Sequence, residues 1–435
     1  MRHELIFDHD TLAFLGERTV TTVHFDGDVP VPGLRTVGVC GRRMWDDPAM
    51  PDATDFLDLD TQLTDEERAI RDAVRDFAAE ELAPHIADWY EHATLPEELG
   101  PRLGSLGLLG MHLTGYGCAG LSATAYGVAC RELEAVDSGL RSFVSVQGSL
   151  AMFAIHHWGS PEQRELWLPR MATGEVIGCF GLTEPDAGSD PASMRTYAQR
   201  DGSDWVLTGT KMWITNGTIA RVAIVWARTD EGIRGFVVPT DLPGFIANEV
   251  PRKLSLRASR TAELVLDGVR LPADAVLPGV TGLRGPLTCL NEARYGILWG
   301  AVGAARACYT EALSYALNRT QFGQPIAGFQ LTQRKLADMV VAVNNAGLVA
   351  LHLGRLKDAG QLAPSQVSYG KLTNVRAALD VARTARGILG AAGITLDHTV
   401  MRHMNNLETV ITYEGTEEMH ALSVGQALTG LPAFR

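Results

Sequence analysis

The feature that most constrains the fold is the order in which hydrophobic periodicity changes along the chain. Helical periodicity begins at LTDEERAIRDAVRDFAAEELAPHI, where Thr64 and Glu67 fit a capping box, and continues to about residue 175. Short β-rich runs such as VAIVWART and AELVLDGVRL follow, separated by Gly, Asp and Pro. From LNEARYGILWG onward, long amphipathic helical patterns return and continue to the end. The sequence therefore predicts an α+β fold with a helical part, a β part and a second helical part.

These changes also predict where the parts of the chain meet. The first 55 residues mix β-branched residues with turn formers, and DDPAMPDATD near their end has the composition of a linker. We expect an N-terminal extension over residues 1–55, a helical domain over residues 56–178, a β domain over residues 179–284 and a helical domain over residues 285–435.

Charge and hydropathy exclude some classes of partner. The chain has 435 residues, with 51 acidic and 38 basic side chains, for a formal net charge of −13. Proteins that bind the phosphate backbone of nucleic acids normally carry a basic excess, so we expect no nucleic-acid partner. We see no apolar run of membrane-spanning length and no signal-peptide core, so we expect no membrane insertion and a cytoplasmic location.

The cysteines give no sign of a metal or redox site. The six cysteines form no C-x-x-C pair, and the adjacent His156 and His157 have no further ligands at metal-binding spacing. Scattered single cysteines are typical of buried thiols in a reducing compartment. We therefore predict no bound metal.

Two motifs in the β part could hold a ligand. GLTEPDAGSD contains Thr183, Gly188 and Ser189, where small residues let backbone N–H groups approach a ligand and hydroxyls can donate hydrogen bonds. A tight turn is the alternative for this stretch. KMWITNG offers Trp213 and Thr215, a flat ring beside a hydroxyl, although Trp213 would serve equally well as a core residue.

Two further motifs lie in the C-terminal helical part. NRTQFGQPIAGFQ places Arg319, Gln321 and Gln330 around a turn, a set suited to a pyrophosphate or an adenine, although many such turns are only solvated. ARGILGAAGI supplies Gly387 and Gly390, spaced so that the backbone can approach a flat or charged group. Each motif alone is also compatible with a purely structural role.

The segment TYEGTEEMHAL, residues 412–422, carries Glu414 between a tyrosine, a glycine and a threonine. The segment could be the first turn of a helix, with Thr416 as its cap and carboxylates favoured by the helix dipole. It could equally present a carboxylate to a ligand, and these residues alone leave both readings open.

Taken together, GLTEPDAGSD, KMWITNG, RTQFGQPIAGFQ and YEGTEEMHALSVGQALTG occur in the order and spacing of the acyl-CoA dehydrogenase family, which this chain resembles from about Leu63 to its C-terminus. The resemblance implies an N-terminal helical domain, a middle β-barrel domain, a C-terminal four-helix bundle and FAD as cofactor. The positions that it implies for FAD binding are Phe180, Leu182, Thr183, Gly188, Ser189, Trp213, Ile214, Thr215, Arg319, Phe322, Gln330, Gly387, Leu389, Gly390, Thr416 and Glu418.

Other stretches narrow the resemblance. GYGCAGLSATAYG, RELEAVDSGLRSFVSVQGSL, KLSLRAS and LNEARYGILWG are similar to the glutaryl-CoA dehydrogenase branch of the family. In that branch the arginine matching Arg141 pairs with the distal carboxylate of the substrate, and the glutamate matching Glu134 tunes it. Helical spacing predicts that Glu134, Arg141 and Ser145 share one helix face. Without the resemblance, a surface Arg141 paired with Asp137 would be the expected arrangement.

The resemblance implies the rest of the substrate site as well. Its further positions are Ser142, Ser189, Asn291, Arg294, Tyr413, Gly415 and Phe434. The branch has a tyrosine where this chain has Leu140, so a neighbouring diacid stays open as the substrate.

Glu414 matches the catalytic base of the family, which removes a proton α to the thioester carbonyl while the β-hydride passes to flavin N5. An apolar pocket raises the pKa of such a carboxylate toward neutrality, as this step requires. Some branches carry the base at the position of Ala293 instead. Glu292 is turned by roughly 100° from that position on a helix, so the base is expected at Glu414.

The resemblance therefore implies FAD-dependent oxidative decarboxylation of glutaryl-CoA to crotonyl-CoA and CO2, by a homotetramer that passes electrons to an electron-transfer flavoprotein. The alternative within the family is dehydrogenation of another dicarboxyl- or short-chain acyl-CoA without decarboxylation. Relatives of this fold that bind DNA or hold flavin without catalysis are a second alternative. These would require a basic face or a missing base, whereas the net charge is −13 and Glu414 is present.

Overall fold

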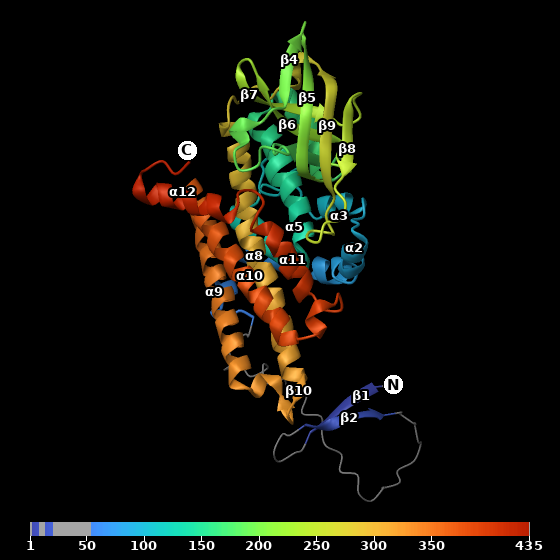
Figure 1. Ribbon diagram of the computed structural model, residues 1–435, viewed down its shortest axis with the longest axis vertical. Helices are drawn as coiled ribbons and strands as arrows, with labels where there is room; N and C mark the ends of the chain where they lie inside the picture. The colour runs from blue at the N-terminus through green and yellow to red at the C-terminus, as the bar shows by residue number, and fades with distance from the viewer. Residues whose placement is uncertain (1, 8–13, 21–53, 435) are drawn as a thin grey trace, which may run out of the picture.

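The computed structural model describes residues 2–7, 14–20 and 54–434 and confirms the order of a helical, a β and a second helical part (Figure 1). Thr64 caps the first helix by accepting from the backbone N–H of Glu67 at 3.2 Å, and the Glu67 carboxylate accepts from the N–H of Thr64 at 2.8 Å. The N-terminal helices are α1 (Asp65–Phe77), α2 (Ile86–His92), α3 (Leu99–Ser105), α4 (Ala123–Val136), α5 (Ser138–Ser145), α6 (Phe153–Trp158) and α7 (Pro161–Ala172).

Asp137 separates α4 from α5. Its backbone is extended, with φ −163°, and its side chain caps α5 by accepting from the N–H of Gly139 at 2.7 Å. A π-helical turn over Val146–Met152 then carries the chain from α5 into α6 without a break. The residues from Ser138 to Ala154 are buried throughout, so α5 runs through the interior of the molecule.

The middle part is a curled seven-stranded sheet at one end of the long axis (Figure 1). Its strands are β3 (Gly178–Gly181), β4 (Tyr197–Asp201), β5 (Asp204–Thr215), β6 (Val222–Thr229), β7 (Gly232–Pro239), β8 (Phe245–Glu249) and β9 (Thr261–Leu271). The order is β3-β6-β4-β5-β9-β8, with β7 also paired to β6. Apolar side chains including Trp205, Val225 and Phe236 fill its interior as a separate cluster.

The C-terminal part is a helical bundle. Its helices are α8 (Arg284–Asn318), α9 (Gln330–Asp358), α10 (Pro364–Leu389), α11 (Val400–Val410) and α12 (Glu417–Thr429). The short strands β10 (Thr320–Gln321) and β11 (Gln324–Pro325) form the turn between α8 and α9. Because α10 packs against α8, α9, α11 and α12, it is the central helix of the bundle.

The helical parts share one core, which fixes α8 against α4. Trp299 on α8 is 2% exposed and lies over Gly127 on α4, where an added Cβ would come within 2.4 Å of its ring. Tyr295 and Trp299 therefore belong to the same apolar cluster as Tyr126 and Phe143. This close approach brings the buried helix α5 next to the N-terminal half of α8.

The N-terminal extension contains a strand pair. β1 (Arg2–Phe7) and β2 (Phe14–Val20) are antiparallel, which agrees with the β-branched character of this stretch. Most of the expected linker lies outside the described residues.

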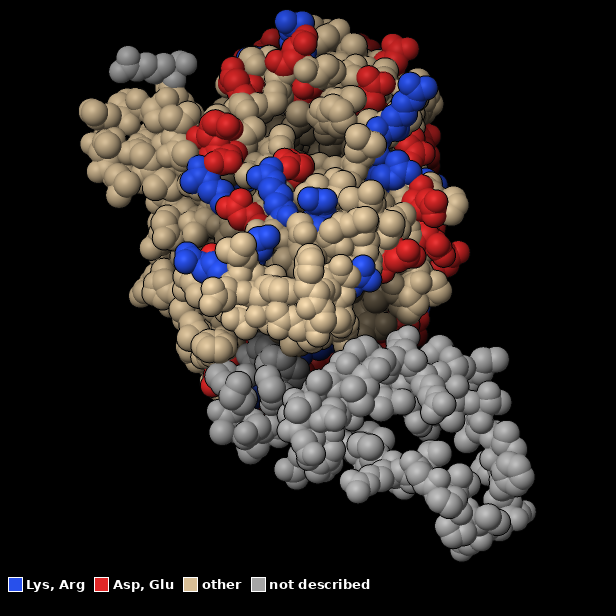
Figure 2. Space-filling view, turned by 60° about the horizontal axis from the view of Figure 1, so that its bottom comes forward, with Lys and Arg blue, Asp and Glu red and all other residues tan. Residues whose placement is uncertain are grey.

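The expectation that no apolar run reaches the length of a membrane span is wrong for α9. Among the described residues, this helix alone has the length and apolarity of a membrane span, with a mean hydropathy of 1.5 over its most apolar window. Because 44% of that window is buried and the helix packs in the bundle, a core helix explains the same pattern. On the face shown in Figure 2, Lys and Arg residues lie among Asp and Glu residues, so the described residues form no continuous basic surface there.

Candidate active site

Glu414 lies in the turn between α11 and α12 and adopts an unusual backbone conformation. Its φ is +53° and that of Gly415 is +99°. A left-handed non-glycine residue costs about 1–2 kcal/mol, so its surroundings must hold it in place. At Gly415 an added Cβ would also lie 2.8 Å from Nε2 of His420, so only glycine fits there. Thr416 then caps α12 by accepting from the N–H of Met419 at 3.4 Å, which agrees with the helix-start reading.

Two cations from the bundle bind three successive carbonyl groups of this turn. Lys371 on α10 donates to the carbonyl oxygens of Tyr413 and Gly415, the latter at 2.6 Å. Arg294 on α8 donates from Nε to the carbonyl oxygen of Glu414 at 2.7 Å. Both cations bind backbone atoms, and Oε2 of Glu414 is buried with no hydrogen-bond partner among the described residues. The turn therefore presents an unpaired carboxylate from a fixed backbone.

The surroundings of Glu414 shift its acidity. Burial raises the pKa of Glu414, and the positive charges of Arg141, Lys371 and Arg294 oppose this rise. The residue as a whole is only half-buried, but Oε2 is enclosed, so desolvation acts on the carboxylate itself. A carboxylate with a raised pKa is suited to remove a proton from carbon. Glu292 binds Nζ of Lys357 at 2.8 Å, so Glu414 is the better candidate for the base.

Arg141 on α5 is fully buried, not a surface residue. Its Nε donates to Oε2 of Glu134 at 2.6 Å, and its Nη2 donates to the hydroxyl of Tyr413. The alternative pairing with Asp137 is wrong, because Asp137 binds Nη1 of Arg402 at 2.7 Å. The expected contact with Glu134 is present, but not because the two residues share a helix face. They lie on separate helices on either side of the break at Asp137.

Several buried polar atoms around Arg141 have no hydrogen-bond partner among the described residues. Nη1 of Arg141, Oε1 of Glu134 and Oγ of Ser145 are buried and have no hydrogen-bond partner within residues 54–434. An unmatched buried polar group costs about 1–3 kcal/mol, and more when it is charged. The free guanidinium donor is therefore suited to a further anionic group, and a carboxylate matches its geometry.

Tyr413 connects the arginine to the base. Its hydroxyl accepts from Arg141 and lies 3.2 Å from Oγ of Ser142, while its backbone continues into Glu414. Burial raises the pKa of Tyr413 to about 12, although Arg141 opposes this, so its hydroxyl keeps its proton. Asn291 completes the set by accepting from Nη1 of Arg294 at 3.3 Å. The structure thus brings most of the predicted substrate residues into one region.

Phe434 is not brought to this region. It lies in the tail beyond α12 and is 48% exposed. Glu414 precedes the same helix, whose 13 residues span about 20 Å. The structure therefore does not bring Phe434 to the other substrate residues within one chain, and its role in substrate binding stays a prediction.

The predicted cofactor residues fall into two groups, and the first lies on or beside β3 and β5. Its members are Phe180, Leu182, Thr183, Gly188, Ser189, Trp213, Ile214 and Thr215. Trp213 is 58% exposed with φ +65°, so the alternative of a core residue is wrong. A strained residue with an exposed ring is suited to a flat ligand. Phe180, Leu182 and Ile214 are buried, so within this chain they pack beneath the surface rather than line it.

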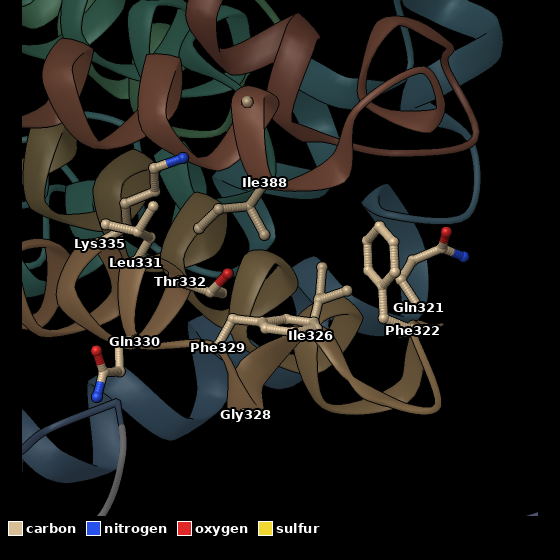
Figure 3. A pocket seen from close by; sticks show the side chains of 11 residues that line it. Gln321, Phe322, Ile326, Gly328, Phe329, Gln330, Leu331, Thr332, Lys335 and Ile388 are labelled. Carbon is tan, nitrogen blue, oxygen red and sulfur yellow. The ribbon is translucent and has the colours of Figure 1, made fainter.

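The second group lies at the far end of the bundle. Phe322, Gln330 and Gly387 line a pocket of about 690 Å³, with Ile326 and Phe329 beside them (Figure 3). Phe322 is 95% exposed, and a Cβ added at Gly387 would meet open space. Apolar rings next to an amide and an open backbone suit the adenine part of a dinucleotide.

The other members of this group lie nearby in sequence. Gly390 has φ +60° at the end of α10, Arg319 is exposed at the end of α8, and Leu389 is buried.

The two groups are too far apart to hold one cofactor within one chain. Arg294 beside Glu414 and Arg319 beside the pocket are 25 positions apart on α8, which corresponds to about 38 Å. The residues of each group fit a part of the cofactor in kind, and we call the two groups half-sites. Thr416 and Glu418 lie at the start of α12, on the side of the first group.

Sequence analysis missed two residues of the turn. Lys371 is 1% exposed on the core-facing side of α10, together with Val367 and Asn374, and a lysine among apolar positions was the available signal. His420 is buried against Gly415, and burial lowers its pKa to about 3. The spacing within TYEGTEEMHAL shows that His420 follows the turn, but not that it packs back on it.

Comparison with known proteins agrees with the geometry. Residues 64–175, 179–269 and 281–429 match the families described as acyl-CoA dehydrogenase N-terminal, middle and C-terminal domain. The solved structure of glutaryl-CoA dehydrogenase from Mycobacterium smegmatis is 66% identical, with a TM-score of 0.88, and the match covers 88% of this chain and 100% of that one.

Two further relatives support the same assignment. A glutaryl-CoA dehydrogenase from Mycobacterium smegmatis in complex with FADH2 is 60% identical, with a TM-score of 0.88, over 88% of this chain and 100% of that one. The mitochondrial short-chain specific acyl-CoA dehydrogenase of Bos taurus is 36% identical over 373 residues, 83% of this chain and 90% of that protein. The chain therefore belongs to the acyl-CoA dehydrogenase family of flavin-dependent oxidoreductases.

Proposed function

We propose that this enzyme oxidises glutaryl-CoA and releases CO2 to form crotonyl-CoA. The observation that carries the proposal is the buried Arg141, whose Nε pairs with Glu134 while its Nη1 has no partner among the described residues. A short unbranched acyl chain would leave this charged donor unmatched, whereas a distal carboxylate would accept from it. Similarity to two glutaryl-CoA dehydrogenases supports the same substrate.

The residues of the site fit the proton transfers of this reaction. FAD, the cofactor of the family, supplies the oxidation by accepting a hydride from the β-carbon of the substrate. Glu414 removes the proton α to the thioester carbonyl, for which its unpaired carboxylate and raised pKa are suited. Arg141 holds the distal carboxylate, which fixes the acyl chain between the two residues.

Decarboxylation follows from the position of that carboxylate. Once the α–β bond is double, the distal carboxylate is vinylogous to the thioester, so the carbon–carbon bond to it can break with release of CO2. The electron pair left behind forms a dienolate. Glu414, which now carries the proton taken from the α-carbon, returns it at the γ-carbon to give crotonyl-CoA.

A second candidate is dehydrogenation of another dicarboxyl- or short-chain acyl-CoA without loss of CO2. Leu140, beside Arg141, is buried and apolar, so it supplies no hydroxyl to a distal carboxylate. Similarity to a short-chain specific relative supports this candidate.

The test is a comparison of substrates in wild type and Arg141→Ala, with a dye as electron acceptor. Turnover of glutaryl-CoA should fall by a factor on the order of 10² or more, since a buried carboxylate loses its partner. Turnover of butyryl-CoA, which has no distal charge, should change far less. Equal losses on both substrates, or a wild type that prefers butyryl-CoA, would contradict the glutaryl assignment. Formation of glutaconyl-CoA without CO2 would favour the second candidate.

We also propose a homotetramer in which each FAD lies between two subunits. The proposal is supported by the two half-sites about 38 Å apart along α8 and by exposed apolar residues on α9, namely Leu331, Val341 and Leu348. An electron-transfer flavoprotein as acceptor and a cytoplasmic location complete the proposal, and both rest on the family resemblance and composition.

Arg319→Ala tests the shared cofactor. A lost charge-assisted contact to the pyrophosphate should lower the flavin absorbance per chain of purified enzyme and weaken the tetramer. Arg270→Ala is the control, because Arg270 is an exposed arginine at the end of β9 that pairs with Asp201 and Asp204, outside α8 and α9. Equal flavin content in both variants would argue against a pyrophosphate contact at Arg319.

A further inference from the structure

Lys371 has no role in the proton transfers above, although it is buried beside the base. We propose that Lys371 is a positioning residue: with Arg294 it fixes the left-handed turn so that the Glu414 carboxylate stays unpaired and able to accept a proton. This inference rests on the proposed role of Glu414. Because Lys371 lies on α10, the central helix of the bundle helps to orient the side chain of Glu414.

The hydrogen bonds of Lys371 go to the turn that carries Glu414. Its ammonium group is enclosed and donates to the carbonyl oxygens of Tyr413 and Gly415, on either side of Glu414. Nζ also lies 5.7 Å from the centre of the Tyr413 ring, the same distance as Cζ of Arg141. Both the backbone and the ring of Tyr413 are therefore held by cations.

The turn needs these contacts. Buried carbonyl groups that lack donors are costly, and no backbone N–H among the described residues donates to these three, so side chains must supply the donors. The left-handed conformation of Glu414 adds a further cost of about 1–2 kcal/mol. Without Lys371 the turn would relax, and the carboxylate could reach a nearby cation and form an ion pair. Such a pair would turn the carboxylate away from the substrate.

The charge of Lys371 also acts on the base directly. The charged or titratable groups near the Glu414 carboxylate are Glu134 on α4, Arg141 on α5, Arg294 on α8, Lys371 on α10, Tyr413 and His420 on α12. His420 is neutral and Tyr413 protonated near neutral pH, so their charges are constant in that range. Burial lowers the pKa of Lys371 to about 7, so its ammonium group is charged in the acidic range. Removal of the Lys371 charge therefore raises the pKa of Glu414 further.

The experiment measures flavin reduction by glutaryl-CoA and butyryl-CoA across the acidic and neutral pH range. Lys371→Met should slow reduction by both substrates by about 10- to 100-fold, because the base is misplaced. It should also move the acid limb of the rate profile to higher pH. Lys371→Arg keeps the charge and should restore the wild-type limb with most of the rate. Lys371→Gln, which is neutral but can still donate, should keep the shifted limb, and it replaces the Met variant if that does not fold.

Lys253→Met is the matched control. Nζ of Lys253 likewise holds a turn, donating to the carbonyls of Leu256 at 2.9 Å and Ser259 at 2.6 Å, and Leu256 has φ +48°. This control should lower the thermal midpoint and leave the acid limb in place.

Two results would overturn the inference. An unchanged limb and rate in Lys371→Met and Lys371→Gln, with wild-type activity present, would overturn it alone. A wild-type flavin that neither substrate reduces would overturn the proposed function together with it.

Discussion

Two buried carboxylates of this enzyme each lie near three cations, yet their acidities shift in opposite directions. Glu132 on α4 is contacted by Arg75, Arg131 and Arg306, and these arginines hold its pKa well below the usual range although burial opposes them. Glu414 also has three cations close by, and its pKa is raised by burial.

The difference lies in what the cations touch. At Glu132 the arginines donate to the carboxylate oxygens, from Nε of Arg131 at 2.9 Å and from Nη1 of Arg306 at 3.0 Å. At Glu414 the nearest donors, Arg294 and Lys371, bind backbone carbonyls and leave the carboxylate free. The first arrangement ties α1, α4 and α8 together, and the second keeps a reactive group available.

The largest expected effect is the loss of chemistry in Glu414→Gln. The amide keeps the shape of the side chain but cannot accept the proton, so flavin reduction by substrate should fall by about 10² to 10⁴. Flavin content and thermal midpoint should not fall, because the turn is held through its backbone. Rapid-mixing measurements of flavin absorbance would show this. Near-normal reduction would place the base elsewhere, with Glu292 the first residue to examine.

Glu132→Gln should lower the stability of the fold but leave the rate of flavin reduction nearly unchanged. Removing the charge leaves Arg306 without a carboxylate and leaves Arg75 and Arg131 with Asp60 alone, and breaking such a buried pair costs about 3–5 kcal/mol. Denaturant unfolding should show this loss, while the rate of flavin reduction per bound FAD stays within a few-fold of wild type. A large fall in that rate with unchanged stability would contradict this prediction, because Glu132 would then act in the reaction as Glu414 does.

The smallest expected effect is the pH dependence of stability. The folded pKa of Glu132 is depressed, so its contribution is present above the unfolded value near 4.5 and is lost as pH falls through the folded value. The folded pKa of Glu414 is raised, so wild-type stability falls as pH rises from about 4.5 through that value, by about 1.4 kcal/mol for each pH unit that separates the two. Glu414→Gln should therefore be slightly more stable than wild type at neutral pH. The thermal midpoints of wild type and Glu414→Gln should be measured against pH. Parallel curves for the two proteins would contradict this expectation.

Patterns among neighbouring residues predicted the order of the parts and the starts of helices. The change from a helical to a β pattern and back gave the order of the parts, and Thr64 with Glu67 marked the start of α1. In the segment around Glu414 the reading as a helix start is confirmed, because Thr416 caps α12, while the reading of Glu414 as a ligand-facing carboxylate stays a prediction. The helix break at Asp137 could also have been read, since an Asp before Ser-Gly is a typical N-cap.

Contacts between segments that are far apart along the chain could not be predicted from sequence patterns. The carbonyls that Lys371 binds belong to Tyr413 and Gly415, which are 42 and 44 residues away, and no periodicity records that approach. The resemblance likewise placed Trp213 and Arg319 in one cofactor site, because motifs in order carry no distances. The length of α8 supplies that distance, which supports the proposal that each FAD lies between two subunits.

That separation along α8 has a genetic consequence. In a dimer that shares its cofactors, a Glu414→Gln subunit keeps the pocket beside Arg319 intact, and an Arg319→Ala subunit keeps the base Glu414 intact. A mixed dimer of the two contains one site with both defects and one site with neither. Two inactive alleles expressed in the same cell should therefore complement each other and restore part of the activity, whereas a double mutant on a single chain would not be rescued by either parent in this way.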